Sequence, residues 1–74
     1  MDIKEFIGKF AEAIEFDDAN SLTPENPLSE IDGWGSLAGM YVISFFDEEF
    51  EKEISTNDIR QAVTIQDLYD MATA

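Results

Sequence analysis

The pattern of apolar and polar positions predicts an amphipathic helix over residues 2 to 15. Asp2 stands at the N-cap position with Glu5 three residues later, an arrangement typical of a helix start. Glu5 and Lys9 are spaced to form an i,i+4 pair on the exposed side. The residues expected on the buried side are Ile3, Phe6, Ile7, Phe10 and Ile14.

A polar segment rich in Asn, Ser, Pro and Gly follows over residues 17 to 35 and predicts a long loop. Loops of this length inside a compact domain usually have a functional role. The apolar residues expected to hold the loop against the helices are Leu22, Leu28, Ile31 and Trp34. Leu28 and Ile31 are spaced to share one helical turn.

Residues 36 to about 50 predict a second helix that is apolar almost all round. At about 100° per residue, its core side is expected to consist of Gly39, Val42, Ile43, Phe46 and Phe50. A chain of 74 residues is too short to bury the opposite side as well, so we expect a partner-binding face there. The residues assigned to that face are Leu37, Met40, Tyr41, Phe45 and Glu48. The alternative is that the long loop covers this side.

Two further start signals predict a short helix and a final helix. Ser55 with Asp58 begins a short helical piece, and Thr64 with Asp67 begins the last helix. The apolar residues of these two segments are Ile59, Ala62, Ile65, Leu68, Met71 and Ala72. The sequence therefore predicts a single all-α domain over residues 1–74. We expect a four-helix bundle with three main helices, one short third helix and a long loop between the first two.

Charge and composition narrow the range of functions. The chain has 4 basic and 17 acidic residues and a formal net charge of −13, which repels nucleic acid and anionic membranes and favours partners with basic patches. It has no cysteine and no histidine, so a disulfide, a cysteine zinc site and a Ser-His-Asp triad are all excluded. The lack of cysteine fits a reducing cytoplasm. The chain has no apolar run of transmembrane length and no signal-peptide pattern, so we expect no membrane insertion. We further expect a monomer and no metal.

Five acidic residues lie between positions 47 and 53, around the end of the second helix. A solvated surface is the usual interpretation of such a run. Weak binding of a divalent cation and docking to a basic partner are the alternatives.

The candidate functional residue is Ser36, which lies between a glycine-rich turn and the apolar helix. Free backbone N–H groups and the helix dipole favour an anion at this position, such as a phosphate attached to the hydroxyl. Gly33 and Gly35 leave room for a sharp turn and for a bulky group. On these residues alone, a serine that merely caps the helix is the more common arrangement.

The order of the predicted elements and several short motifs resemble the acyl and peptidyl carrier proteins over essentially the whole chain. That family has a short Asp-Ser-Leu motif at the start of its second helix, where this chain has Gly35-Ser36-Leu37. The acidic balance adds to the resemblance. So do the segments Asp47-Glu48-Glu49-Phe50, Ile54 and Thr64-Ile65.

The resemblance implies that Ser36, flanked by Gly35 and Leu37, carries a 4′-phosphopantetheine arm that a phosphopantetheinyl transferase adds from coenzyme A. It further implies that the arm holds an acyl or aminoacyl group as a thioester. Acyl- or aminoacyl-loading and acyl-transfer enzymes would be the partners, and the protein itself would not be an enzyme. The residues expected to line an acyl pocket between the helices are Phe46, Phe50, Ile54, Ile59, Ala62, Leu68 and Met71.

Three positions depart from the family pattern. Gly35 stands where the family usually has Asp, and Ala38 and Tyr41 stand where carriers of fatty acid synthesis are usually acidic. These departures predict a specialised carrier for a dedicated fatty acid, lipid or polyketide pathway. Two alternatives remain open at this stage. One is an aminoacyl or peptidyl carrier, and the other is an unmodified acidic helical domain that docks a basic partner through Tyr41 and its neighbours.

Overall fold

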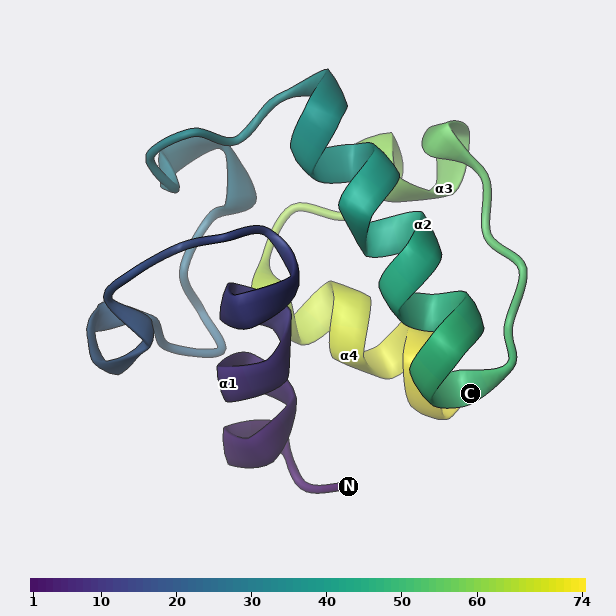
Figure 1. Ribbon diagram of the computed structural model, residues 1–74, viewed down its shortest axis with the longest axis horizontal. Coiled ribbons are helices and arrows are strands. Elements are labelled where there is room, and N and C mark those ends of the chain that lie inside the picture. Colours follow the sequence, from purple (N-terminus) through teal and green to yellow (C-terminus); the bar gives the residue numbers. More distant parts are fainter.

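The computed structural model describes residues 1–74 and contains four α-helices and no strand. The helices are α1 (Ile3–Ala13), α2 (Ser36–Phe50), α3 (Thr56–Gln61) and α4 (Ile65–Thr73). Helical residues make up 64% of the chain, which confirms the all-α class. In Figure 1, α2 crosses the molecule with α3 behind its first half, and α1 lies on the opposite side of α4 from α3. Contacts join α1 to α2 and α4, and α2 to α3.

Side chains cap three of the four helices where the sequence predicts them. The Oδ1 atom of Asp2 accepts a hydrogen bond of 2.8 Å from the backbone N–H of Glu5. At the starts of α3 and α4, a hydroxyl and a carboxylate three residues apart each accept the other's backbone N–H. These two reciprocal pairs are Ser55 with Asp58 and Thr64 with Asp67. Local sequence therefore determines where α1, α3 and α4 begin.

The core is built around the fully buried ring of Phe6. Five aromatic rings from α1, α2 and α4 surround it, with centroid distances of 6.1 Å to Phe10, 5.6 Å to Phe45, 6.4 Å to Phe46, 6.0 Å to Phe50 and 5.3 Å to Tyr69. Tilted and edge-to-face pairs of this kind contribute about 0.5–1.5 kcal/mol each beyond the burial of their area. Phe6 thus joins three of the four helices into one apolar cluster.

The buried side of α2 is rotated from the predicted one. Phe45, which the sequence places on the partner face, is only 5% exposed because its ring packs against Phe6, so that prediction is wrong. Ile43 and Phe50, expected in the core, are only half-buried. The residues that α2 buries are Ala38, Gly39, Val42, Phe45 and Phe46. Apolar residues lie on almost every side of α2, so the position of α1 decides which side becomes the core.

The long connection between α1 and α2 is attached to the segment that precedes α4. The backbone N–H of Leu28 donates 2.8 Å to the carbonyl of Val63, and that of Gln66 donates 2.9 Å to the carbonyl of Pro24. Leu22, Leu28 and Ile31 are buried, and Trp34 packs half-buried on Phe10, as the sequence predicts. Leu28 and Ile31 also share one 3-10 turn. The loop is therefore a fixed wall of the molecule rather than a loose link.

One predicted ion pair has a different partner. Lys9 lies 3.6 Å from the carboxylate of Glu49 on α2, instead of pairing with Glu5 within α1. The expected i,i+4 pair is therefore wrong, because Glu49 on the neighbouring helix lies within reach of the same ammonium group. This pair is exposed on both sides and contributes little, roughly 0–1 kcal/mol.

Phe45→Ala is expected to lower the free energy of unfolding by about 3–5 kcal/mol, because it removes a buried ring from the aromatic cluster. Leu37→Ala changes a side chain of the same helix that is 61% exposed, and we expect a change within about 0.5 kcal/mol. Urea denaturation of the two variants measures both values. Equal losses would contradict the orientation of α2 described above.

Candidate functional site

Ser36 is the first residue of α2, and Gly35 precedes it as the N-cap residue. The side chain of Ser36 is exposed, and no side-chain capping hydrogen bond forms at this end of the helix. Ser36 therefore does not cap α2, which corrects the simpler interpretation of this serine. The first turn of α2 also carries no acidic residue. The hydroxyl of Ser36 therefore lies at the positive end of a 15-residue helix whose first N–H groups have no side-chain partner.

The two glycines before Ser36 differ in backbone conformation. Gly33 has φ = +86°, a left-handed conformation that side chains disfavour. Gly35 has an extended backbone with φ = 175°, and a Cβ atom built there meets no atom within 4 Å. Only Gly33 is therefore required by the turn. The absence of a side chain at Gly35 leaves α2 uncapped and its N–H groups open to a ligand.

A cavity of about 570 Å³ opens beside Ser36, between the end of the long loop, the start of α2 and α3. Its lining residues are Leu28, Ser29, Trp34, Gly35, Ser36, Gly39, Met40, Thr56, Ile59, Arg60, Ala62 and Val63. Half of them are hydrophobic, so the cavity presents an apolar wall beside the serine hydroxyl.

The predicted acyl pocket coincides with this cavity in part. Ile59 and Ala62 line it, as predicted. The other five predicted residues do not: Phe46 and Leu68 are fully buried in the core, and Phe50, Ile54 and Met71 are half-buried elsewhere. These five residues do not line a cavity between the main helices, because the aromatic rings around Phe6 already fill that space. The cavity therefore lies at one end of the molecule, outside the main core.

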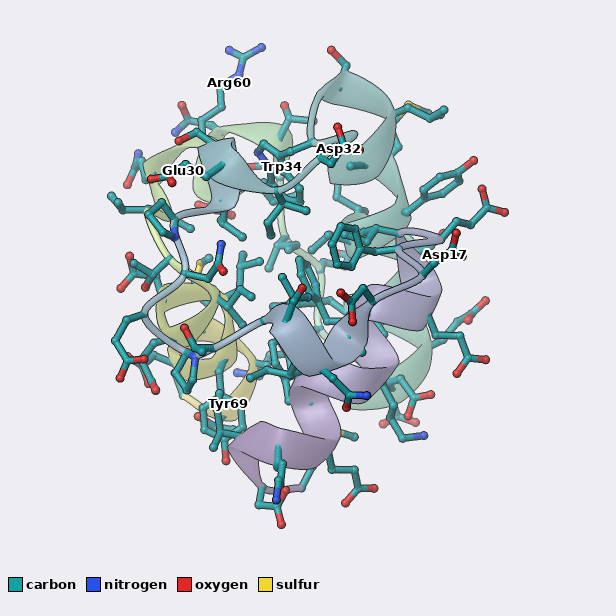
Figure 2. All side chains as sticks on the ribbon, turned by 90° about the vertical axis from the view of Figure 1, so that its left-hand side faces the viewer. Asp17, Glu30, Asp32, Trp34, Arg60 and Tyr69 are labelled. Atoms are coloured by element: carbon teal, nitrogen blue, oxygen red, sulfur yellow. The ribbon has the colours of Figure 1, made fainter.

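The cavity differs from the rest of the surface in charge. No acidic residue lines it, although 17 of the 74 residues are acidic, and its one charged residue is Arg60 of α3. Two other cavities, of about 310 and 560 Å³, are each lined by three acidic residues. In Figure 2, Arg60 and Trp34 lie at the end of the molecule where α2 begins, and the guanidinium group of Arg60 points away from the ribbon.

The partner face predicted on α2 is partly exposed as expected. Leu37 and Met40 are both 61% exposed and Glu48 is exposed, whereas Tyr41 is half-buried and Phe45 is buried. Met40 and the 64% exposed Val63 both line the cavity beside Ser36. Leu37, Met40 and Val63 are three of the four large hydrophobic side chains that the chain exposes. We call these three residues the apolar rim.

Seven residues that line the cavity were not assigned to the site from the sequence. They are Leu28, Ser29, Trp34, Gly39, Thr56, Arg60 and Val63. The signal available for Arg60 was its rarity, because it is one of only four basic residues. Val63 carried no signal, because the hydrogen bond from Leu28 that holds its carbonyl against the long loop is formed only in the folded chain.

Asp67 fixes the turn that carries Val63 to the cavity. Its Oδ2 atom accepts hydrogen bonds from the backbone N–H groups of Val63 at 2.9 Å and Thr64 at 3.1 Å. These two bonds hold the pKa of Asp67 below its ordinary value, and the bond from Val63 has the larger effect. The Thr64 hydroxyl lowers the pKa by a smaller amount. The charged form of Asp67 is therefore the form that the folded chain favours.

The structure gathers no group of three or more His, Cys, Asp or Glu side chains that could hold a metal ion, and this includes the acidic run over residues 47 to 53. None of the helices has the length and apolar character needed to cross a bilayer. Comparisons with protein-family models, with curated proteins and with solved structures found no match.

Asp67→Asn is expected to lower the melting temperature at pH 7, because it removes the charged acceptor of two backbone N–H groups. The folded-state pKa is depressed, so this stabilisation is fully present above the unfolded value of about 3.9 and is lost as pH falls through the folded value. The difference between wild type and variant should therefore shrink in acid. Asp70→Asn is the matched control, because the Asp70 carboxylate accepts only from the Gln66 side chain. Thermal melts from pH 7 to pH 2 that show a constant difference would contradict this role.

Gly35→Asp is expected to stabilise the fold by about 0.3–1 kcal/mol, because an acid at the N-cap supplies the missing acceptor and interacts favourably with the helix dipole. Gly33→Asp adds the same charge two residues earlier, where the positive φ disfavours a side chain. We expect that variant to be less stable than wild type. Denaturation at low salt compares the two, and a destabilised Gly35→Asp variant would mean that the position has no room for a cap.

Proposed function

We propose that this protein is a carrier that holds an acyl group as a thioester on a 4′-phosphopantetheine arm attached to Ser36. In this proposal the four helices form the bundle of the acyl carrier family, and the protein shuttles cargo between the enzymes of a dedicated pathway without catalysing a reaction. The observation that carries the proposal is an exposed, non-capping Ser36 at the start of α2, beside a cavity free of acidic residues.

The residues around Ser36 fit the chemistry of such an arm. The unpaired N–H groups at the start of α2 and the helix dipole favour a phosphate on the Ser36 hydroxyl. The cavity beside it offers an apolar wall that includes Trp34, Met40 and Ile59. When attached, the arm supplies the thiol that this cysteine-free chain lacks. With no histidine, the chain has no usual base to turn Ser36 into a nucleophile.

The surface around Ser36 supports docking to partner enzymes. The apolar rim of Leu37, Met40 and Val63 gives a hydrophobic contact next to the attachment point. The rest of the chain is strongly acidic, which steers partners with basic patches toward it. A phosphopantetheinyl transferase and acyl-loading and acyl-transfer enzymes are the partners that follow from this proposal.

The cavity changes where the cargo is expected to lie. Because Phe46 and Leu68 are fully buried in a packed core, a chain inserted among them would have to displace rings at a typical strain of about 1–3 kcal/mol. The open cavity along α3 needs no such displacement. We therefore assign the cargo to the cavity lined by Ile59 and Ala62 rather than to the interior between α2 and α4.

An unmodified interaction domain is the second candidate, and the exposed apolar rim is the observation that favours it. Such a domain would use Leu37, Met40 and Val63 for direct contact and would leave Ser36 unmodified. Within the carrier class, an aminoacyl or peptidyl cargo fits the same site. A carrier and an unmodified interaction domain differ in one covalent bond, the one that attaches the arm to Ser36.

Incubation with coenzyme A and a promiscuous phosphopantetheinyl transferase is expected to raise the intact mass by one arm. Ser36→Ala should abolish the increase. Ser29→Ala is the matched control, since Ser29 lines the same cavity and should leave the increase intact. An unchanged wild-type mass, with a transferase shown to be active on another carrier, would overturn the carrier proposal in favour of the interaction domain.

A further inference from the structure

Arg60 is a cation without an anionic partner in a strongly acidic chain. The one ion pair within the molecule joins Lys9 to Glu49, and the ammonium group of Lys52 donates to the backbone carbonyl of Ala74. Lys4 and Arg60 make neither kind of contact, although 17 carboxylates are present, but Arg60, unlike Lys4, borders the cavity beside Ser36. Arg60 is also the only charged residue among those that line this cavity.

Arg60 of α3 borders the cavity beside Ser36. Its side chain is exposed and points into solvent at the end of the molecule where α2 begins (Figure 2). Glu30 and Asp32 lie at this same end, yet neither lines the cavity and neither pairs with Arg60. The acidic side chains are thus kept out of a site that retains a single positive charge.

We infer that Arg60 binds an oxyanion of the group carried on Ser36 and so holds the arm in the cavity along α3. This inference rests on the proposed attachment of a phosphopantetheine arm to Ser36. A guanidinium group is suited to this task, because it stays charged and its planar fork matches the oxygens of phosphate or carboxylate. Two sources supply such an oxyanion, namely the phosphodiester of the arm and a carboxylate at the end of the cargo.

The geometry makes Arg60 a positioning residue. Arg60 and Ser36 line the same cavity from different helices, so an arm that starts at Ser36 and is held by Arg60 stays beside the apolar wall of that cavity. That wall includes Met40, Ile59 and Val63. Release of the oxyanion by a partner's own basic groups would then free the arm for transfer. Arg60 therefore provides an electrostatic latch in a protein whose overall charge would otherwise repel the arm's phosphate.

Trp34 provides a direct reporter of this latch, because it is the only tryptophan and lines the cavity. The arm is attached to the full chain with a transferase, its attachment is verified by mass, and its thiol is labelled with a nitroxide that quenches nearby fluorescence. One label is uncharged and a second bears a carboxylate. In wild type, the nitroxide is expected to quench Trp34 emission, and Arg60→Glu should reduce the ratio of docked to free arm about two- to fivefold, the range of an exposed ion pair.

Lys4→Glu is the matched control, because it makes the same charge change at the start of α1, at the opposite end of the molecule from the start of α2 (Figure 1). It should leave the quenching as in wild type, and Arg60→Lys should retain part of it. Raising sodium chloride should weaken the quenching in wild type but not in Arg60→Glu. Circular dichroism confirms that each variant is folded before its emission is compared.

The outcomes distinguish the two sources of the oxyanion and show whether the role of Arg60 or the carrier proposal fails. Dependence on Arg60 with the uncharged label identifies the phosphodiester, and dependence only with the carboxylate label identifies the cargo. Equal quenching in wild type and Arg60→Glu with both labels, on protein whose mass shows the arm, would overturn the role of Arg60 and leave the carrier function standing. A wild-type mass without the arm would overturn the carrier proposal and the latch together.

Discussion

The contact on which the rest of the structure depends is the packing of five aromatic rings around Phe6. A domain of this size buries too little surface to tolerate gaps, so its few large side chains must meet at one point. Phe6 brings α1 against Phe45 and Phe46 of α2 and against Tyr69 of α4. The Tyr69 hydroxyl then donates 2.7 Å to the carbonyl of Met1, which ties the two ends of the chain to the same cluster.

Filling the centre with rings has a consequence for function. Space for a ligand is displaced to the periphery, where the small side chains Gly35, Gly39 and Ala62 leave a cavity between α2, α3 and the loop. The loop can form one wall because its backbone is bonded to the segment before α4. A rigid aromatic core therefore supports an open site without itself taking part in binding. In the proposed carrier function, cargo in such a site would stay accessible to partner enzymes.

The sequence was sufficient for features whose causes are local. The starts of α1, α3 and α4 follow from Asp2, Ser55 and Thr64, because each cap acts on a backbone group only a few residues away. The exposed Ser36 and the attached loop were likewise predicted from turn residues and apolar spacing. The Gly35 backbone shows the limit of this reasoning. A glycine read as a sharp turn is in fact extended, and its role is to leave a helix end uncapped.

The features that could not be predicted depend on which elements meet in space. A helix as evenly apolar as α2 fits several orientations by periodicity alone, and the approach of α1 buries Phe45 while Phe50 stays half-buried. The same holds for charge, because the sequence shows 17 acids but not that they all avoid one cavity. An acidic surface steers basic partners from a distance, yet at the attachment site it would repel the phosphate that the proposed function requires. With no carboxylate lining this one cavity, and with Arg60 beside it, a single small domain can meet both requirements.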